Sequence, residues 1–183
     1  GAIDGNLQRL QTDYIDIYQL HWPERQANFF SQRGYTEEMA AQSLDDLTPF
    51  LETIQALNDE IKRGRIRAYG LSNDTAWGVM RYLWEADKNG LIAPITVQNP
   101  YSLLNRLYEV AMAEIAHREN VGLLAYSPLG FGVLSGKYLD GKRPAGARLT
   151  MYDRFARYTN EEALSATAQY AKIAADAGLD MAQ

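Results

Sequence analysis

The spacing of alternating strand and helix patterns is the feature that most limits how this chain can fold. Strand-like segments begin at Arg65, Pro94 and Val121, so their starts lie about 29 and about 27 residues apart. Each interval holds one strand, one crossover helix and two short loops, the unit from which parallel sheets are built. A further segment, residues 14–21, carries apolar residues on both faces, which favours a strand buried on both sides. The pattern therefore predicts a parallel α/β sheet.

Helical patterns occupy the intervals between these strands and both ends of the chain. Apolar residues recur with helical spacing over the ranges 49–63, 75–88, 107–119 and 161–177. We expect Thr48 to cap the first of these helices, with Pro49 at its first position. Residues 1–10 look like the end of another helix, and residues 179–183 like the start of one capped by Asp180. The connection between Glu24 and Asp46 is too long for an ordinary loop, which predicts a packed or functional excursion.

Composition excludes several classes of function. The net charge of -5 gives no long-range attraction for nucleic acid, and no apolar run is long enough to cross a membrane. Cysteine is absent, so disulfides and thiolate metal sites are excluded, and we see no other metal-ligand spacing. The amino terminus shows no signal-peptide pattern, so we expect a cytoplasmic protein that binds neither nucleic acid nor membranes.

Polar side chains gather where the predicted strands end. In parallel sheets and barrels, ligands and catalytic groups collect at the carboxyl ends of the strands. Strand by strand, the polar residues at these ends are His21, then Ser72 and Asn73, then Gln98 and Asn99, then Tyr126 and Ser127. Four polar strand ends in succession predict a ligand site along one edge of the sheet.

These residues also have structural interpretations. His21 could serve only to satisfy a buried carbonyl group instead of taking part in catalysis. Ser72 and Asn73 could cap the helix that follows them. Gln98 and Asn99, which precede Pro100, could belong to a turn, and Tyr126 could pack in the core with its hydroxyl toward solvent.

The segment GFGVLSGKY, residues 130–138, combines glycine with lysine after a strand. It is not a P-loop, because Tyr138 follows the lysine where that motif needs serine or threonine. It also departs from the dinucleotide fingerprint, since Gly132 and Gly136 are one residue too far apart. Glycines nevertheless let backbone amides approach phosphate oxygens closely, so the segment is compatible with an anionic cofactor.

Four blocks of the sequence together resemble the aldo-keto reductase family. The blocks are DYIDIYQLHWP, IRAYGLSN, VQNPYSLLNR and LLAYSPLGFGVLSGKYLDGKRPAGAR. Within the family, they are most similar to bacterial Tas-type proteins and to relatives of the potassium-channel beta subunits. The resemblance implies a (β/α)8 TIM barrel that binds NADPH and reduces aldehydes or ketones by hydride transfer. It also implies that residues 1–183 are a single incomplete barrel domain, without the first three strands and the last one.

The resemblance also implies roles for individual residues. His21 would donate a hydrogen bond to the carbonyl group of a small substrate. The nicotinamide carboxamide would be held by Ser72, Asn73 and Gln98, and the ring would stack on Tyr126. The loop around the pyrophosphate would contain Ser127, Leu129, Gly130, Leu134 and Lys137. The family's catalytic Asp, Tyr and Lys precede the strand of the histidine and have no counterpart in this chain, and no metal is implied.

Three functions therefore stay open at the level of sequence. The first is NADPH-dependent carbonyl reduction, with this chain as the central and later part of the enzyme. The second is a non-catalytic incomplete barrel that binds nucleotide weakly or serves only in assembly, with self-association to cover its open sheet edges. The third, a barrel isomerase or aldolase, has less support because no lysine or carboxylate pair lies at a strand end.

Overall fold

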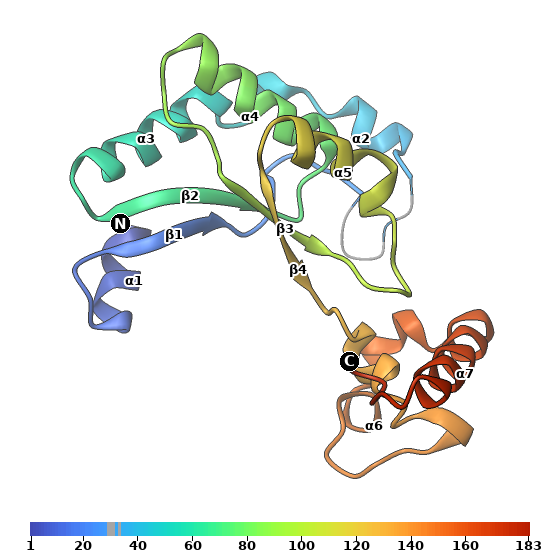
Figure 1. Ribbon diagram of the computed structural model, residues 1–183. Coiled ribbons are helices and arrows are strands. Elements are labelled where there is room, and N and C mark those ends of the chain that lie inside the picture. The colour runs from blue at the N-terminus through green and yellow to red at the C-terminus, as the bar shows by residue number, and fades with distance from the viewer. Residues whose placement is uncertain (29–31, 33) are drawn as a thin grey trace. The chain divides into compact units, whose positions relative to one another are not determined.

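The computed structural model describes residues 1–28, 32 and 34–183. Part of the long connection from Glu24 to Asp46, namely residues 29–31 and 33, lies outside the described residues. The chain divides into two compact units (Figure 1). Unit 1 contains Gly1–Asn99 and Ala111–Leu124, and unit 2 contains Pro100–Val110 and Ala125–Gln183. A single domain over 1–183 stays a prediction.

Unit 1 is built on a parallel sheet with strand order β1-β2-β3-β4. Both β1 and β3 pair in parallel with β2. The strands are β1 (Ile15–Leu20), β2 (Ile66–Ser72), β3 (Thr96–Pro100) and β4 (Gly122–Tyr126), with the last residue of β3 and the last two of β4 in unit 2. The predicted α/β class with parallel strands is confirmed, as are the four strand positions to within about two residues.

The helices are α1 (Ala2–Leu10), α2 (Glu37–Ala41), α3 (Phe50–Lys62), α4 (Ala76–Lys88), α5 (Tyr108–Arg118), α6 (Arg148–Met151) and α7 (Glu161–Asp176). Of these, α1, α3, α4, α5 and α7 fall close to the predicted ranges, whereas the short helices α2 and α6 were not predicted. Short 3-10 helices add η1 (Leu44–Asp46), η2 (Gly130–Ser135), η3 (Leu139–Gly141) and η4 (Asp153–Tyr158). Figure 1 shows α3 and α4 on the same face of β1 and β2.

The core of unit 1 lies between this pair of helices and the sheet. Leu57 of α3 packs against Ile66 and Tyr69 of β2, and Tyr69 is fully buried. The Tyr69 hydroxyl donates a hydrogen bond to the carbonyl oxygen of Ile92 at 3.0 Å, so its polar end is satisfied. We call this side of the sheet the helix face; it also carries Tyr18 and Leu20.

The prediction that the first strand is buried on both sides is wrong. Ile17 of β1 is 38% exposed, whereas Leu71 of β2 is almost fully buried. The reason is the position of β1 at one end of the strand order, since only β2 pairs with it among the described residues.

The predicted cap of α3 is also wrong. No side chain caps α3: its N-cap is Pro49, and the backbone amide of Thr48 donates to Glu24 Oε2 at 3.2 Å instead. Residues 179–183 form a turn, closed by a hydrogen bond of 3.0 Å from the Gln183 amide to the Asp180 carbonyl oxygen. The helix start predicted at Asp180 stays a prediction.

Unit 2 has a core of its own. Val133, Tyr138, Leu149 and Tyr158 are buried together, with aromatic rings packed around them. The Tyr138 hydroxyl accepts a hydrogen bond from the Leu149 amide at 3.3 Å, and the side-chain amide of Asn105 donates to the Tyr158 hydroxyl at 3.2 Å. This core fixes the glycine-containing segment 130–138 against α6 and η4.

Candidate functional site

The end of β1 is tied to the end of β2 through Asn73. His21 is exposed, and its ring lies against the Trp22 ring with centroids 4.3 Å apart. The carbonyl oxygen of His21 accepts a hydrogen bond from Asn73 Nδ2 at 2.9 Å. Asn73 has a φ of 53°, in the left-handed region that asparagine tolerates better than most residues. The turn at Asn73 therefore holds the backbone of His21 in place.

Ser72, Asn73 and Gln98 come together at the ends of β2 and β3. The Ser72 hydroxyl donates a hydrogen bond to the backbone carbonyl oxygen of Gln98 at 3.0 Å, and the backbone amide of Asn73 donates to the same oxygen at 3.0 Å. The two structural alternatives for these residues are wrong. The N-cap of α4 is Thr75, whose hydroxyl accepts from the Gly78 amide at 3.3 Å, and Gln98 lies inside β3, not in a turn.

A second polar contact lies on the side of the sheet opposite the helix face. Gln98 Nε2 donates a hydrogen bond to Gln19 Oε1 at 3.0 Å. Gln19 pairs with Gly70 and Ser72 pairs with Gln98, so alternation along the strands puts these four residues on one side. We call this side the amide face.

A buried ion pair lies below the strand ends. Arg25 and Asp74 are 8% and 6% exposed, and Arg25 Nη2 donates to Asp74 Oδ1. The same guanidinium donates to Thr75 Oγ1 at 3.1 Å and lies 5.1 Å from the centroid of the Trp77 ring. Burial raises the pKa of Asp74, and Arg25 opposes that rise. Asn99 Nδ2 donates to the Asp74 carbonyl oxygen at 2.8 Å, which ties β3 to the same cluster.

Neither Arg25 nor Asp74 was singled out from the sequence. Asp74 directly follows a strand end, which is a signal that could have found it. Arg25 lies in the long connection that was predicted to be packed or functional, and there Ala27 and Met39 are buried as well. The connection was predicted to be either packed or functional, and these buried residues confirm that its described part is packed.

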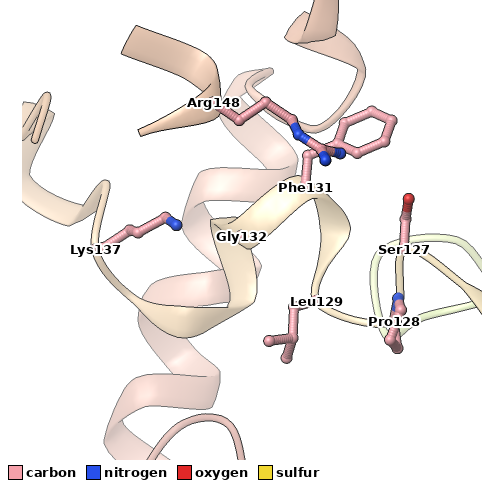
Figure 2. Close-up of a pocket in the computed structure, with 7 residues that line it drawn as sticks. All are labelled: Ser127, Pro128, Leu129, Phe131, Gly132, Lys137 and Arg148. Atoms are coloured by element: carbon pink, nitrogen blue, oxygen red, sulfur yellow. The ribbon is translucent and has the colours of Figure 1, made fainter. Parts of the chain in front are cut away.

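Unit 2 contains a pocket of about 510 Å³ beside the glycine-containing segment (Figure 2). Several residues of this loop have φ values in the left-handed region, among them Ser127 at 54°, Phe131 at 58° and Gly132 at 93°. The φ of Gly132 favours glycine at this position, and Lys137 Nζ lies close to it, as Figure 2 shows. The pocket is lined by Ser127, Pro128, Leu129, Phe131, Gly132, Lys137 and Arg148.

Some of the predicted loop residues line this pocket, and others are buried in the protein and do not line it. Ser127, Leu129 and Lys137 are lining residues, whereas Gly130 and Leu134 are buried and belong to the support of the loop. Burial raises the pKa of Tyr126, which is half-buried and interacts with Arg157. The lining residue Arg148 was missed, although it lies within the last of the four blocks.

Arg148 places a second positive charge at the pocket. Its guanidinium lies 5.6 Å from the centroid of the Phe131 ring and 5.2 Å from that of Phe155, and Figure 2 shows it beside Phe131. Cation–π contacts of this kind hold a guanidinium in place without neutralising its charge. The pocket therefore combines Lys137 and Arg148 with a tightly turned backbone.

The predicted site residues divide between the two units. His21, Ser72, Asn73 and Gln98 belong to unit 1. Tyr126 and the residues from Ser127 to Lys137 belong to unit 2. Within residues 1–28, 32 and 34–183, no group of three or more acidic or histidine side chains could hold a metal ion. No helix in the same ranges is both long and apolar enough to span a membrane.

Comparison with known proteins defines the class to which this fold and site belong. The family model described as "Aldo/keto reductase family" matches residues 2–183. The chain is 53% identical to Protein tas of Escherichia coli (strain K12), over 100% of this chain and 51% of that protein. It is 39% identical to an aldo-keto reductase of Babesia bovis, over 94% of this chain and 64% of that protein.

A third relative is a probable voltage-gated potassium channel subunit beta of Oryza sativa subsp. japonica. It is 28% identical over 100% of this chain and 50% of that protein. The parallel α/β fold and these matches define an oxidoreductase class that typically uses a nicotinamide cofactor. The chain belongs to the aldo-keto reductase family, as its four sequence blocks predicted. It spans about half the length of the Tas protein.

Proposed function

We propose that this chain supplies cofactor-binding and substrate-binding residues for the NADPH-dependent reduction of aldehydes or ketones. The observation that supports this most strongly is the pocket in unit 2, where Lys137 and Arg148 face a loop with left-handed backbone at Ser127 and Gly132. Two cations beside a backbone that a ligand can approach closely suit a pyrophosphate group, because lysine acts as a point charge and arginine donates two parallel hydrogen bonds. The residues present therefore fit a dinucleotide cofactor.

The strand ends of unit 1 suit a nicotinamide group. A carboxamide group needs donor and acceptor partners, and Gln98, whose Nε2 is bonded to Gln19 Oε1, can offer its own Oε1 as an acceptor for the NH₂ group. Ser72 fixes the backbone beside this side chain through its bond to the Gln98 carbonyl oxygen. When bound, the cofactor supplies the hydride; the proposed role of these side chains is to set which face of its ring is presented. Tyr126 is proposed to stack on the ring.

His21 is proposed to act on a small carbonyl substrate. Its imidazole is exposed, while its backbone is held by the bond from Asn73. As the carbonyl carbon is reduced, its oxygen gains negative charge, and a positioned N–H donor stabilises that charge. This role requires only hydrogen-bond donation, and it assigns no covalent step to the histidine.

Substitution of Lys137 or Arg148 by methionine tests the cofactor proposal. Each variant is expected to raise the dissociation constant for NADPH by about tenfold or more, because a hydrogen bond to a charged group contributes about 1.5–3 kcal/mol. The measurement is a fluorescence titration of the chain with NADPH. Lys142→Met is the matched control, since Lys142 is exposed and lies outside the pocket lining. Unchanged NADPH emission at saturating concentrations of the unsubstituted chain would refute cofactor binding.

A second candidate function, a non-catalytic module that serves in assembly, has one observation in its favour. β1 ends the strand order and exposes Ile17, and an unpaired strand edge readily pairs with another chain. On this proposal, the chain self-associates through β1. Sedimentation velocity is expected to show dimers or larger species that increase with concentration and decrease in Ile17→Lys. A monomer at every concentration would contradict self-association.

A further inference from the structure

We propose that Gln19 is a positioning residue that orients the side-chain amide of Gln98 toward the nicotinamide carboxamide. The proposal rests on the proposed function, because it refines how the nicotinamide is held. It adds a residue on β1, outside the strand ends that the sequence indicated. Gln19 acts through Gln98 and need not touch the cofactor itself.

The strand register makes this contact possible across a whole strand. Gln19 lies on β1 and Gln98 on β3, with β2 between them in the sheet. Gln19 pairs with Gly70, and Gln98 pairs with Ser72, the next residue of β2 on the amide face. The hydrogen bond of 3.0 Å from Gln98 Nε2 to Gln19 Oε1 therefore spans β2. Long side chains can bridge such diagonal positions when nothing stands between them.

Gly70 lies on the strand that this bridge crosses, and Thr96 of β3 leaves no room for a side chain there. A Cβ atom at this position would lie 2.2 Å from Thr96 Oγ1 and 3.4 Å from Gln19 Nε2. Gly70 has no positive φ that would demand glycine, so the close approach of its neighbours is the reason for the missing side chain. The two glutamines and Gly70 thus form one unit, which we call the amide bridge.

The direction of the hydrogen bond determines what Gln98 can offer a ligand. Its Nε2 is engaged with Gln19, so its Oε1 points away from that bond. Gln98 Oε1 accepts no hydrogen bond from the residues that the structure describes, which leaves this oxygen to accept from the NH₂ group of a carboxamide. Without Gln19, the amide of Gln98 could rotate and present either end. The amide bridge therefore fixes the orientation of the Gln98 side-chain amide before the cofactor binds.

The test compares two cofactors that differ only at the carboxamide. In the 3-acetylpyridine analogue of NADP⁺ a methyl ketone replaces the carboxamide, so its NH₂ donor is missing. Titration calorimetry on the unsubstituted chain is expected to show tighter binding of NADP⁺ than of the analogue. Gln19→Met removes the acceptor at similar volume and is expected to weaken NADP⁺ binding roughly three- to tenfold, the usual effect of one neutral hydrogen bond. Binding of the analogue should change by less than about twofold.

Three further variants define the controls. Gln19→Glu keeps an oxygen acceptor for Gln98 Nε2 and is expected to restore the preference for NADP⁺. Gln19→Asn is shorter by one methylene, so it should lose the preference while keeping a polar group; it also replaces Gln19→Met if that variant does not fold. Gln55→Met is the matched control, because Gln55 is an exposed residue of α3.

The possible outcomes separate this inference from the function on which it rests. If Gln19→Met weakens both cofactors by the same factor, Gln19 is only structural and the positioning role is overturned. If Gln19→Met keeps the full preference for NADP⁺, the role is overturned as well. If the unsubstituted chain binds neither cofactor, the proposed function fails and the inference fails with it. In a Gln98→Met background, Gln19→Met should have no further effect on the preference.

Discussion

Replacing Arg25 with alanine is expected to lower the free energy of unfolding by about 3–5 kcal/mol. The substitution leaves the carboxylate of Asp74 without its charged partner at a position that is only 6% exposed. Burial already raises the pKa of Asp74, so desolvation of the carboxylate is the larger influence even when Arg25 is present. Urea unfolding followed by circular dichroism measures the loss, and the fluorescence of the neighbouring Trp77 provides a second signal.

Two controls show whether the loss comes from the buried charge. Arg118→Ala removes an arginine from an exposed pair with Glu114, and it should cost no more than about 0.5 kcal/mol. Arg25→Met combined with Asp74→Asn removes both charges. The asparagine keeps an oxygen that can accept the hydrogen bond from the Thr75 backbone amide, which Asp74 Oδ1 accepts at 2.8 Å in the unsubstituted chain. We expect the double variant to recover much of the stability. A loss in Arg25→Ala as small as that in Arg118→Ala would show that the ion pair is not a main support of the strand ends.

The positions of the strand ends could be predicted because they depend on local sequence. A two-residue alternation, a stopping glycine and the length of each crossover all lie within about 30 residues of one another. These signals place Ser72 at the end of β2 and Gln98 within β3, as the structure has them. Their contact then follows, because the carboxyl ends of parallel neighbours lie at one edge of a sheet.

The supports of the site could not be predicted in the same way. Gln19 meets Gln98 across 79 residues of sequence, and Arg25 meets Asp74 across 49. The first contact depends on strand register, and the second on the missing side chain of Gly78, where a Cβ atom would collide with both Arg25 and Asp74. One sequence contains no local pattern for such pairs. They also explain why polar residues occur where burial alone would favour apolar ones.

The backbone of the pocket loop shows a further limit of sequence reasoning. The glycines of segment 130–138 indicated that its backbone can adopt conformations that other residues rarely adopt, and Gly132 does have a positive φ. Ser127 and Phe131 adopt the same left-handed region, which side chains other than glycine and asparagine rarely enter. Such conformations cost about 1–3 kcal/mol each and persist only when the surrounding structure holds them. The buried core below this loop, with Val133 and Tyr158, provides that support.

Replacing His21 with alanine is expected to reduce the rate of carbonyl reduction by two to three orders of magnitude, because loss of one positioned donor to a developing oxyanion costs about 2.7–4 kcal/mol. The assay is the consumption of NADPH with an activated aromatic aldehyde as substrate. The dissociation constant for NADPH should stay within about twofold, since the proposed partner of the imidazole is the substrate oxygen and not the cofactor. This separation of rate from cofactor affinity distinguishes a catalytic donor from a structural residue.

Two variants complete the test of His21. His21→Gln keeps an N–H donor and should retain part of the rate that His21→Ala loses. His117→Ala is the matched control, because His117 is an exposed residue of α5 with no place among the proposed site residues. If the rate of His21→Ala equals that of His117→Ala, the imidazole does not contact the reacting oxygen. In that case the bond from Asn73 to the His21 carbonyl oxygen would serve only to join β1 to β2.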